Sequence, residues 1–229
     1  MKRLIFNEEH EMFRDSVRRF VRAEIEPQVE RWREAGICDK QAFRKAGDQG
    51  LLCMWADERY GGLGMTDFRF EQIVIEEVIR YGDMGLFLSL HSRLVGPYIG
   101  ELGSEELKQR LLPRCISGET ILGIAMTEPG AGSDLSAIKS RAVRDGDDWL
   151  LSGSKTYISN GINGGAFVVA ARTVPDKPHG IGLFVVEEGM AGFSRGRNLK
   201  KMGLKTQDTA ELFMENVRVP AANVLGDPQ

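Results

Sequence analysis

The hydrophobic pattern of this chain changes once, close to Gly118, and this change limits the possible folds more than any other feature. Before it, apolar residues recur every three or four positions, as on the buried face of a helix. After it, short alternating runs are separated by turn residues, which is typical of half-buried strands. The pattern predicts an α+β multidomain protein: an all-α helical domain over residues 1–120, then an antiparallel β-sandwich or barrel domain over residues 121–229.

Helix start and stop signals are frequent in the first half of the chain. Asn7, followed by acidic residues, predicts a helix start, and Pro27 is expected to kink or end that helix. A second helix is expected from about Lys40 to Gln49. A later short helix is expected to begin at Ser104 and to be limited by Pro113.

The second half of the chain contains turn signals such as Asp145-Gly146 and Asn160-Gly161. Between these turns lie runs with the alternation of strands. The predicted strands cover residues 121–126, 137–144, 149–158, 167–172, 181–187 and 210–213.

Bulk composition excludes several classes of protein. The net charge is −3 with acids and bases interspersed, so no basic surface for nucleic acid is expected. Apolar runs are too short to span a bilayer, and the first residues lack a signal peptide, which indicates a cytoplasmic, bacterial protein. The three cysteines are odd in number and lack metal-ligand spacing, so buried reduced thiols are expected. The three histidines are too scattered to suggest a zinc site.

A small-residue stretch, residues 126–134, follows the first predicted strand. Its glycines allow another molecule to approach the main chain, and the hydroxyls of Thr127 and Ser133 flank it. Such a loop suits a phosphate or a polar ring edge, although by composition alone it could simply turn a corner between strands. It is not a dinucleotide fingerprint, because a strand and not a helix is predicted after it.

Three blocks in this order resemble the acyl-CoA dehydrogenases: Thr127 to Asp134 (TEPGAGSD), Gly153 to Gly161 and Met202 to Thr209. The wording is most similar to that of the long-chain enzymes, and the resemblance covers essentially the whole chain. It implies FAD as the cofactor, a fatty acyl-CoA as substrate, and an electron-transfer flavoprotein as electron acceptor. It also implies a full-length homotetramer with a C-terminal helical bundle, which this chain lacks.

The resemblance also assigns roles to individual residues. Ser159 is expected to reach the flavin N5, Tyr157 to lie against the isoalloxazine, and Ser133 to contact both the pyrophosphate and the pantetheine arm. The family usually has Trp or Phe at the position of Tyr157 and Thr at that of Ser159. The full set of expected FAD-binding residues is Ile124, Met126, Thr127, Gly132, Ser133, Tyr157, Ile158 and Ser159.

Substrate contacts are expected at Ser133 and Lys177, the latter with His179 near the coenzyme A phosphates. A solvated surface loop is the simpler interpretation of Lys177 and His179. The resemblance implies that the helical domain forms one wall of the acyl tunnel, with residues 82–85 near its floor.

No catalytic residue is expected within this chain, because the family's base is a glutamate of the C-terminal bundle. Glu128 is not expected to replace it, since the following Pro129 restricts its backbone to extended geometry. The isolated chain is therefore expected to be inactive. Two alternatives remain open: a related acyl-CoA oxidase or monooxygenase-like flavoprotein, and a non-catalytic acyl-CoA-binding fragment.

Overall fold

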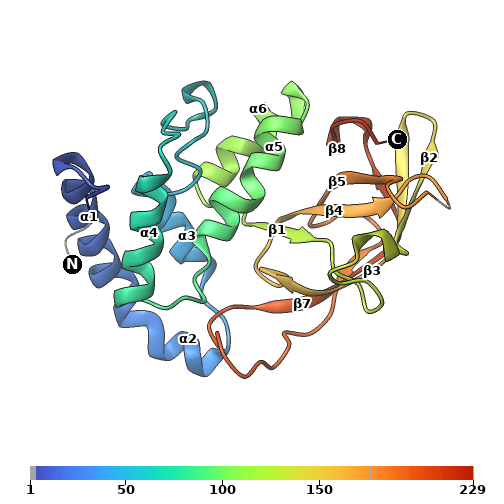
Figure 1. Ribbon diagram of the computed structural model, residues 1–229. Helices are drawn as coiled ribbons and strands as arrows, with labels where there is room; N and C mark the ends of the chain where they lie inside the picture. Colours follow the sequence, from blue (N-terminus) through green and yellow to red (C-terminus); the bar gives the residue numbers. More distant parts are fainter. Residues whose placement is uncertain (1–3, 176, 229) are drawn as a thin grey trace.

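The computed structural model describes residues 4–175 and 177–228, and Figure 1 shows its helices on one side and its strands on the other. The predicted order of an α domain followed by a β domain is confirmed. Among the described residues, six α-helices precede the first strand: α1 Glu8–Phe20, α2 Val29–Ala35, α3 Lys40–Asp48, α4 Phe68–Tyr81, α5 Gly96–Leu102 and α6 Glu105–Ile116.

Local chemistry explains where α1 begins and where its regular ladder stops. The Asn7 side chain accepts a hydrogen bond from the backbone N–H of His10, which satisfies one donor of the first turn. The helix then changes to a π-type turn over Val21–Ile25 and a 3-10 turn over Glu26–Gln28. Pro27 has no N–H to donate, so it interrupts the helix as expected.

The prediction that Pro113 limits the helix starting at Ser104 is wrong, because α6 continues to Ile116 with the proline inside it. The Ser104 hydroxyl accepts from the Leu107 N–H and caps the start, as expected. Leu111 and Cys115, on either side of the proline, are both fully buried. Their burial outweighs the one backbone hydrogen bond that Pro113 cannot make.

In the part of the chain that the structure describes, the strands form one eight-stranded sheet that is not closed into a barrel, in the order β6-β7-β3-β2-β4-β5-β8, with β1 also paired to β4. Most neighbours are antiparallel, but β1 and β2 each pair with β4 in parallel, which alternation alone does not reveal. The strands are β1 Leu122–Ala125, β2 Arg141–Asp145, β3 Asp148–Ser159, β4 Ala166–Arg172, β5 Ile181–Glu187, β6 Phe193–Arg195, β7 Thr209–Val219 and β8 Val224–Leu225.

Some predicted strand limits were wrong. The strand expected to start at Ala137 starts at Arg141, because the Asp134 side chain accepts from the Ser136 N–H and caps a 3-10 turn over Leu135–Ala137. β7 is much longer than expected and continues through Asn216, which has a φ of 49°. The short strands β6 and β8 were not predicted.

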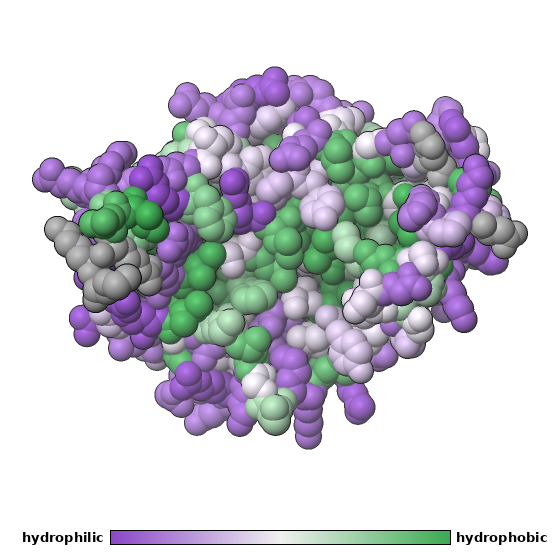
Figure 2. Space-filling view, in the orientation of Figure 1, coloured by the Kyte–Doolittle hydropathy of each residue, from purple (hydrophilic) through white to green (hydrophobic). Residues whose placement is uncertain are grey.

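The two halves share part of their core. Ile99 and Leu111 of the helical half and Leu122 and Val168 of the sheet belong to one buried cluster. β1 therefore leads out of a packed junction and ends where the small-residue loop begins. In Figure 2, apolar surface gathers in the middle of one face, reaching from the helices toward the sheet. Such gathered apolar surface is typical of binding faces.

None of the described helices combines the length and the apolar character that a membrane crossing requires.

Candidate functional site

The loop after β1 and the end of β3 lie side by side. The Thr156 N–H donates to the Thr127 carbonyl oxygen at 2.9 Å. The β3–β7 register shifts by one residue between Lys155 and Ile158, which is a β-bulge. Tyr157 lies in this bulge with a φ of 58° and is 70% exposed. A bulky residue at positive φ is uncommon and clusters at functional sites, so the bulge aims a tyrosine outward beside the loop.

Ser159, the last residue of β3, lies close to β1. A Cβ on Gly123 would meet the Ser159 carbonyl oxygen at 3.0 Å and the Phe167 ring at 2.8 Å. Only glycine allows β1 to lie this close to the end of β3. The structure thus brings together the two groups of residues predicted from the sequence, one following β1 and one ending β3.

A buried ion pair supports the loop from beneath. Lys155 of β3 is 0% exposed, and its Nζ lies 2.7 Å from Glu128 Oε1 and 3.1 Å from the Met126 carbonyl oxygen. Glu128 also accepts from the backbone N–H groups of Ser140 and Lys139. Burial raises the pKa of Glu128, but these hydrogen bonds outweigh it and hold the pKa below its ordinary value. Glu128 therefore anchors the loop as a carboxylate.

The outer side of the loop leaves polar groups available. Within residues 4–175 and 177–228, no protein group is hydrogen-bonded to the hydroxyls of Thr127, Ser133 and Ser159, which are exposed or half-buried. A Cβ built on Gly130 or Gly132 meets nothing within 4 Å. Free hydroxyls, open main chain and an exposed aromatic ring fit the polar edge, phosphates and flat ring of a flavin nucleotide.

Of the remaining predicted contacts, Ile124 is half-buried on β1 and Ile158 is buried on β3, so neither side chain is fully open to solvent. Met126 is half-buried at the start of the loop.

Lys177 lies near Ser136, just beyond the end of the small-residue loop. Arg172, which the sequence analysis missed, links these two segments. The Arg172 guanidinium donates to the carbonyl oxygens of Ser136, Ile138 and Lys177. A hollow of about 390 Å³ lies here, lined by Ser136, Ile138, Arg172, Pro175, Lys177 and Pro178. His179 is exposed.

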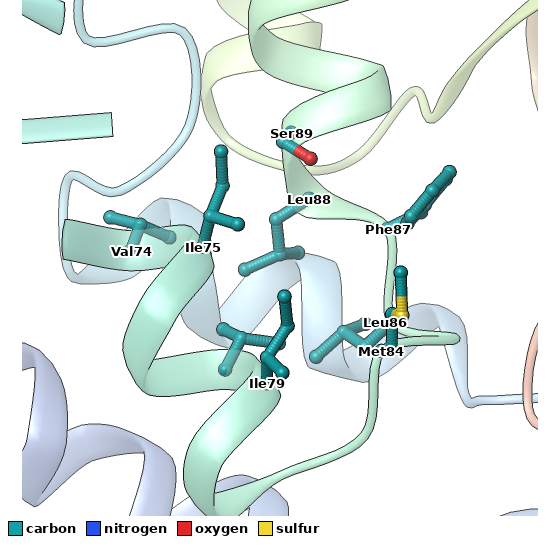
Figure 3. Close-up of a pocket in the computed structure, with 9 residues that line it drawn as sticks. Val74, Ile75, Ile79, Met84, Leu86, Phe87, Leu88 and Ser89 are labelled. Carbon is teal, nitrogen blue, oxygen red and sulfur yellow. The ribbon is translucent and has the colours of Figure 1, made fainter. Parts of the chain in front are cut away.

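An apolar cavity of about 80 Å³ lies in the helical half (Figure 3). Val74, Ile75 and Ile79 of α4 face Leu86 and neighbouring residues of the segment after the helix. A Cβ on Gly85 would meet the Thr206 hydroxyl at 1.9 Å and the Gln207 backbone N at 2.5 Å. The segment that lines the cavity is therefore packed tightly against the loop before β7.

The thiols and histidines offer no alternative site. Cys38, Cys53 and Cys115 are free and buried, as the sequence predicted, and burial raises the pKa of both Cys38 and Cys53 to about 12. Across the described part of the chain, no three acidic, cysteine or histidine side chains are grouped as metal ligands.

Comparison with known proteins agrees with the fold. Residues 7–119 match the N-terminal domain of acyl-CoA dehydrogenases and residues 123–217 match the middle domain. The long-chain specific acyl-CoA dehydrogenase of Sus scrofa mitochondria is 47% identical over 228 residues, which cover 98% of this chain and 53% of that protein.

Solved structures give the same result. The acyl-CoA dehydrogenase of Geobacillus kaustophilus superposes with a TM-score of 0.95 at 46% identity, covering 99% of this chain and 60% of that one. An acyl-CoA dehydrogenase of Bacillus anthracis complexed with FAD has a TM-score of 0.89 at 30% identity, covering 99% of this chain and 39% of that one. The chain spans about half the length of the curated relatives it matches. By these matches along almost its whole length, the chain belongs to the acyl-CoA dehydrogenase family.

Proposed function

We propose that this chain supplies the first two domains, residues 1–120 and 121–229, of an FAD-dependent acyl-CoA dehydrogenase. The observation that carries the proposal is the exposed Tyr157, held at positive φ beside a loop whose outer hydroxyls have no partner among the described residues. The membership of the family and the FAD complex of the Bacillus anthracis relative support it.

In this proposal each named residue binds or orients the cofactor. The Tyr157 ring lies against the isoalloxazine, and the Thr127 and Ser159 hydroxyls meet its polar atoms. Main-chain groups at Met126 and Ile158 face the same ring, with Ile124 behind them. Gly132 and Ser133 are proposed to face the pyrophosphate. When bound, FAD supplies the hydride acceptor that no protein side chain provides.

The proposed substrate is a fatty acyl-CoA of medium to long chain. The apolar cavity beside α4 suits the end of a hydrocarbon chain, and the hollow at Lys177 and Arg172 suits phosphates. An electron-transfer flavoprotein as acceptor, a homotetrameric full-length protein and a cytoplasmic location stay predictions. The relatives that match include mitochondrial enzymes, so the compartment is the least supported of these.

Tyr157→Ala is expected to weaken FAD binding about tenfold, because aromatic stacking contributes about 0.5–1.5 kcal/mol beyond simple burial. Tyr157→Phe keeps the ring and is the matched control, expected to bind FAD as the wild type does. Quenching of flavin fluorescence during titration of the apoprotein measures both. Equal dissociation constants for the alanine and wild-type proteins would remove Tyr157 from the site.

In the full-length protein, which includes the C-terminal bundle, Ser159→Ala is expected to slow flavin reduction by acyl-CoA at least about tenfold, since one oriented donor near a reacting centre is lost. Anaerobic stopped-flow bleaching of flavin absorbance, repeated with acyl-CoAs of graded length, measures the rate and the preferred chain. Ser152→Ala is the control. Ser152 lies on β3, as Ser159 does, and its hydroxyl is hydrogen-bonded to Asn216 of β7. Unchanged reduction in the Ser159 variant would count against the proposed contact.

A further inference from the structure

The backbone N–H and carbonyl oxygen of Leu122, the first residue of β1, are both held by buried side chains of other elements. The Leu122 N–H donates to His91 Nδ1 at 3.0 Å, and the Leu122 carbonyl oxygen accepts from Asn160 Nδ2 at 2.9 Å. His91 is 0% exposed, Leu122 0% and Asn160 2%. Water therefore does not replace either hydrogen bond when its side chain is lost.

His91 joins the helical half to β1. Because Nδ1 accepts from Leu122, its proton is on Nε2, which lies 3.0 Å from the Cys115 carbonyl oxygen near the end of α6. The ring also meets Phe43 edge-on, with 5.8 Å between centroids. The imidazole thus fixes the last helix and the first strand at a set separation.

Asn160 joins β1 to the end of β3. It follows Ser159 directly and has a φ of 58°, a conformation that asparagine tolerates better than most residues. Its own N–H donates to the Asp208 carbonyl oxygen at 3.2 Å. Asn160 therefore fixes the position of β1 relative to Tyr157 and Ser159.

We propose that His91 and Asn160 are positioning residues for the flavin site, acting through the backbone N–H and carbonyl oxygen of Leu122. Neither is assigned to the cofactor by the family resemblance, and neither needs to touch it. They fix β1 relative to β3, and so set the position of Thr127, which follows β1, relative to Ser159, which ends β3. This inference rests on the proposed function.

The test measures FAD affinity and thermal stability in parallel, using the complete purified protein. His91→Leu removes acceptor and donor at similar volume, and Asn160→Asp replaces the donor with a carboxylate oxygen and adds a negative charge, as the control Asn223→Asp also does. Both are expected to weaken FAD binding at least about tenfold. His91→Gln offers an amide oxygen and an amide N–H, and is expected to restore the dissociation constant to within about threefold of the wild type.

A variant at a third position separates positioning from general destabilisation. Asn223 is also buried, 2% exposed, and donates to the Val185 carbonyl oxygen at 3.0 Å, far along the sheet. Asn223→Asp is expected to lower the melting temperature but to leave the FAD dissociation constant within about twofold. If His91→Leu and Asn160→Asp behave like Asn223→Asp, the inference is overturned.

Hydrogen exchange in the apoprotein gives a readout that does not need the cofactor. Amides of residues 122–134 are expected to exchange at least about tenfold faster in His91→Leu and Asn160→Asp than in the wild type, and unchanged exchange would overturn the inference. A wild-type protein that bound no FAD would instead overturn the proposed function, and the exchange data would still decide whether the backbone at Leu122 is held by His91 and Asn160.

Discussion

Lys155→Met is expected to lower the free energy of unfolding by about 3–5 kcal/mol, because it leaves the Glu128 carboxylate buried without its cation. Lys155 is 0% exposed and Glu128 is 7% exposed, so solvent does not take over the lost interaction. Methionine fills most of the space of the lysine stem, which limits the contribution of a cavity to the loss. The same substitution frees the Met126 carbonyl oxygen and is expected to loosen the flavin loop.

Urea unfolding at neutral pH measures the effect, with Lys45→Met as the matched control. Lys45 also pairs with a carboxylate, that of Glu24, but both side chains are about 40% exposed, at 41% and 42%. Its loss is expected to cost less than about 1 kcal/mol. Adding Glu128→Gln to Lys155→Met removes the unpaired charge and is expected to recover much of the stability. Equal losses from Lys155→Met and Lys45→Met would contradict the prediction.

The outline of the fold could be predicted from the sequence because local rules decide it. The cap at Asn7 and the break at Pro27 each depend on neighbouring residues alone. The change from helix to strand is visible because the two periods, 3.6 and 2, differ so strongly. Pro113 was misjudged because the rule considers the backbone only, whereas buried neighbours on the same helix face keep α6 intact.

The parallel pairing of β1 with β4 could not be predicted from alternation. Leu122 faces Ala166 across more than forty residues of intervening chain, and no local signal marks that partner. The same limit applies to β6 and β8, which exist because neighbouring strands provide hydrogen bonds to short segments.

The candidate site was predicted only in part, for a related reason. Motif resemblance selects the residues on the open side of the site, including Thr127 of the loop and Tyr157 of β3. It assigns no role to the residues beneath, Lys155 among them although it lies within a motif, since Lys155, Arg172 and His91 act through partners distant in sequence. The one signal available in the sequence was Lys155, a lysine in a strand whose other residues are half apolar. A lysine buried there needs a carboxylate partner.

Glu71 gives the second large expected effect, and it has the opposite sign. This residue of α4 is 4% exposed, and its Oε1 has no hydrogen-bond partner among the described residues. Burial raises the pKa of Glu71 from 4.5 to about 7, and the nearby positive charge of Arg93 offsets only part of that rise. The buried carboxylate therefore destabilises the folded protein once it is ionised.

Glu71→Gln is expected to stabilise the protein at pH 8 by about 3 kcal/mol and to have little effect below pH 4.5. Between about pH 4.5 and about pH 7 the unfolded chain has released the Glu71 proton while the folded chain still holds it. Folded protein binds more protons in this window, so the stability of the wild type falls as pH rises, and glutamine removes that fall.

Urea unfolding of both proteins at pH 5, 6, 7 and 8 gives the difference directly, and other titrating groups cancel in the comparison. Glu106→Gln, at an exposed acid on α6, is the control and is expected to change stability by less than about 0.5 kcal/mol throughout. A Glu71→Gln difference that does not grow with pH would mean that the wild-type carboxyl is not held neutral by its surroundings. A growing difference would identify α4 as a helix whose packing weakens near neutral pH, at the wall of the apolar cavity.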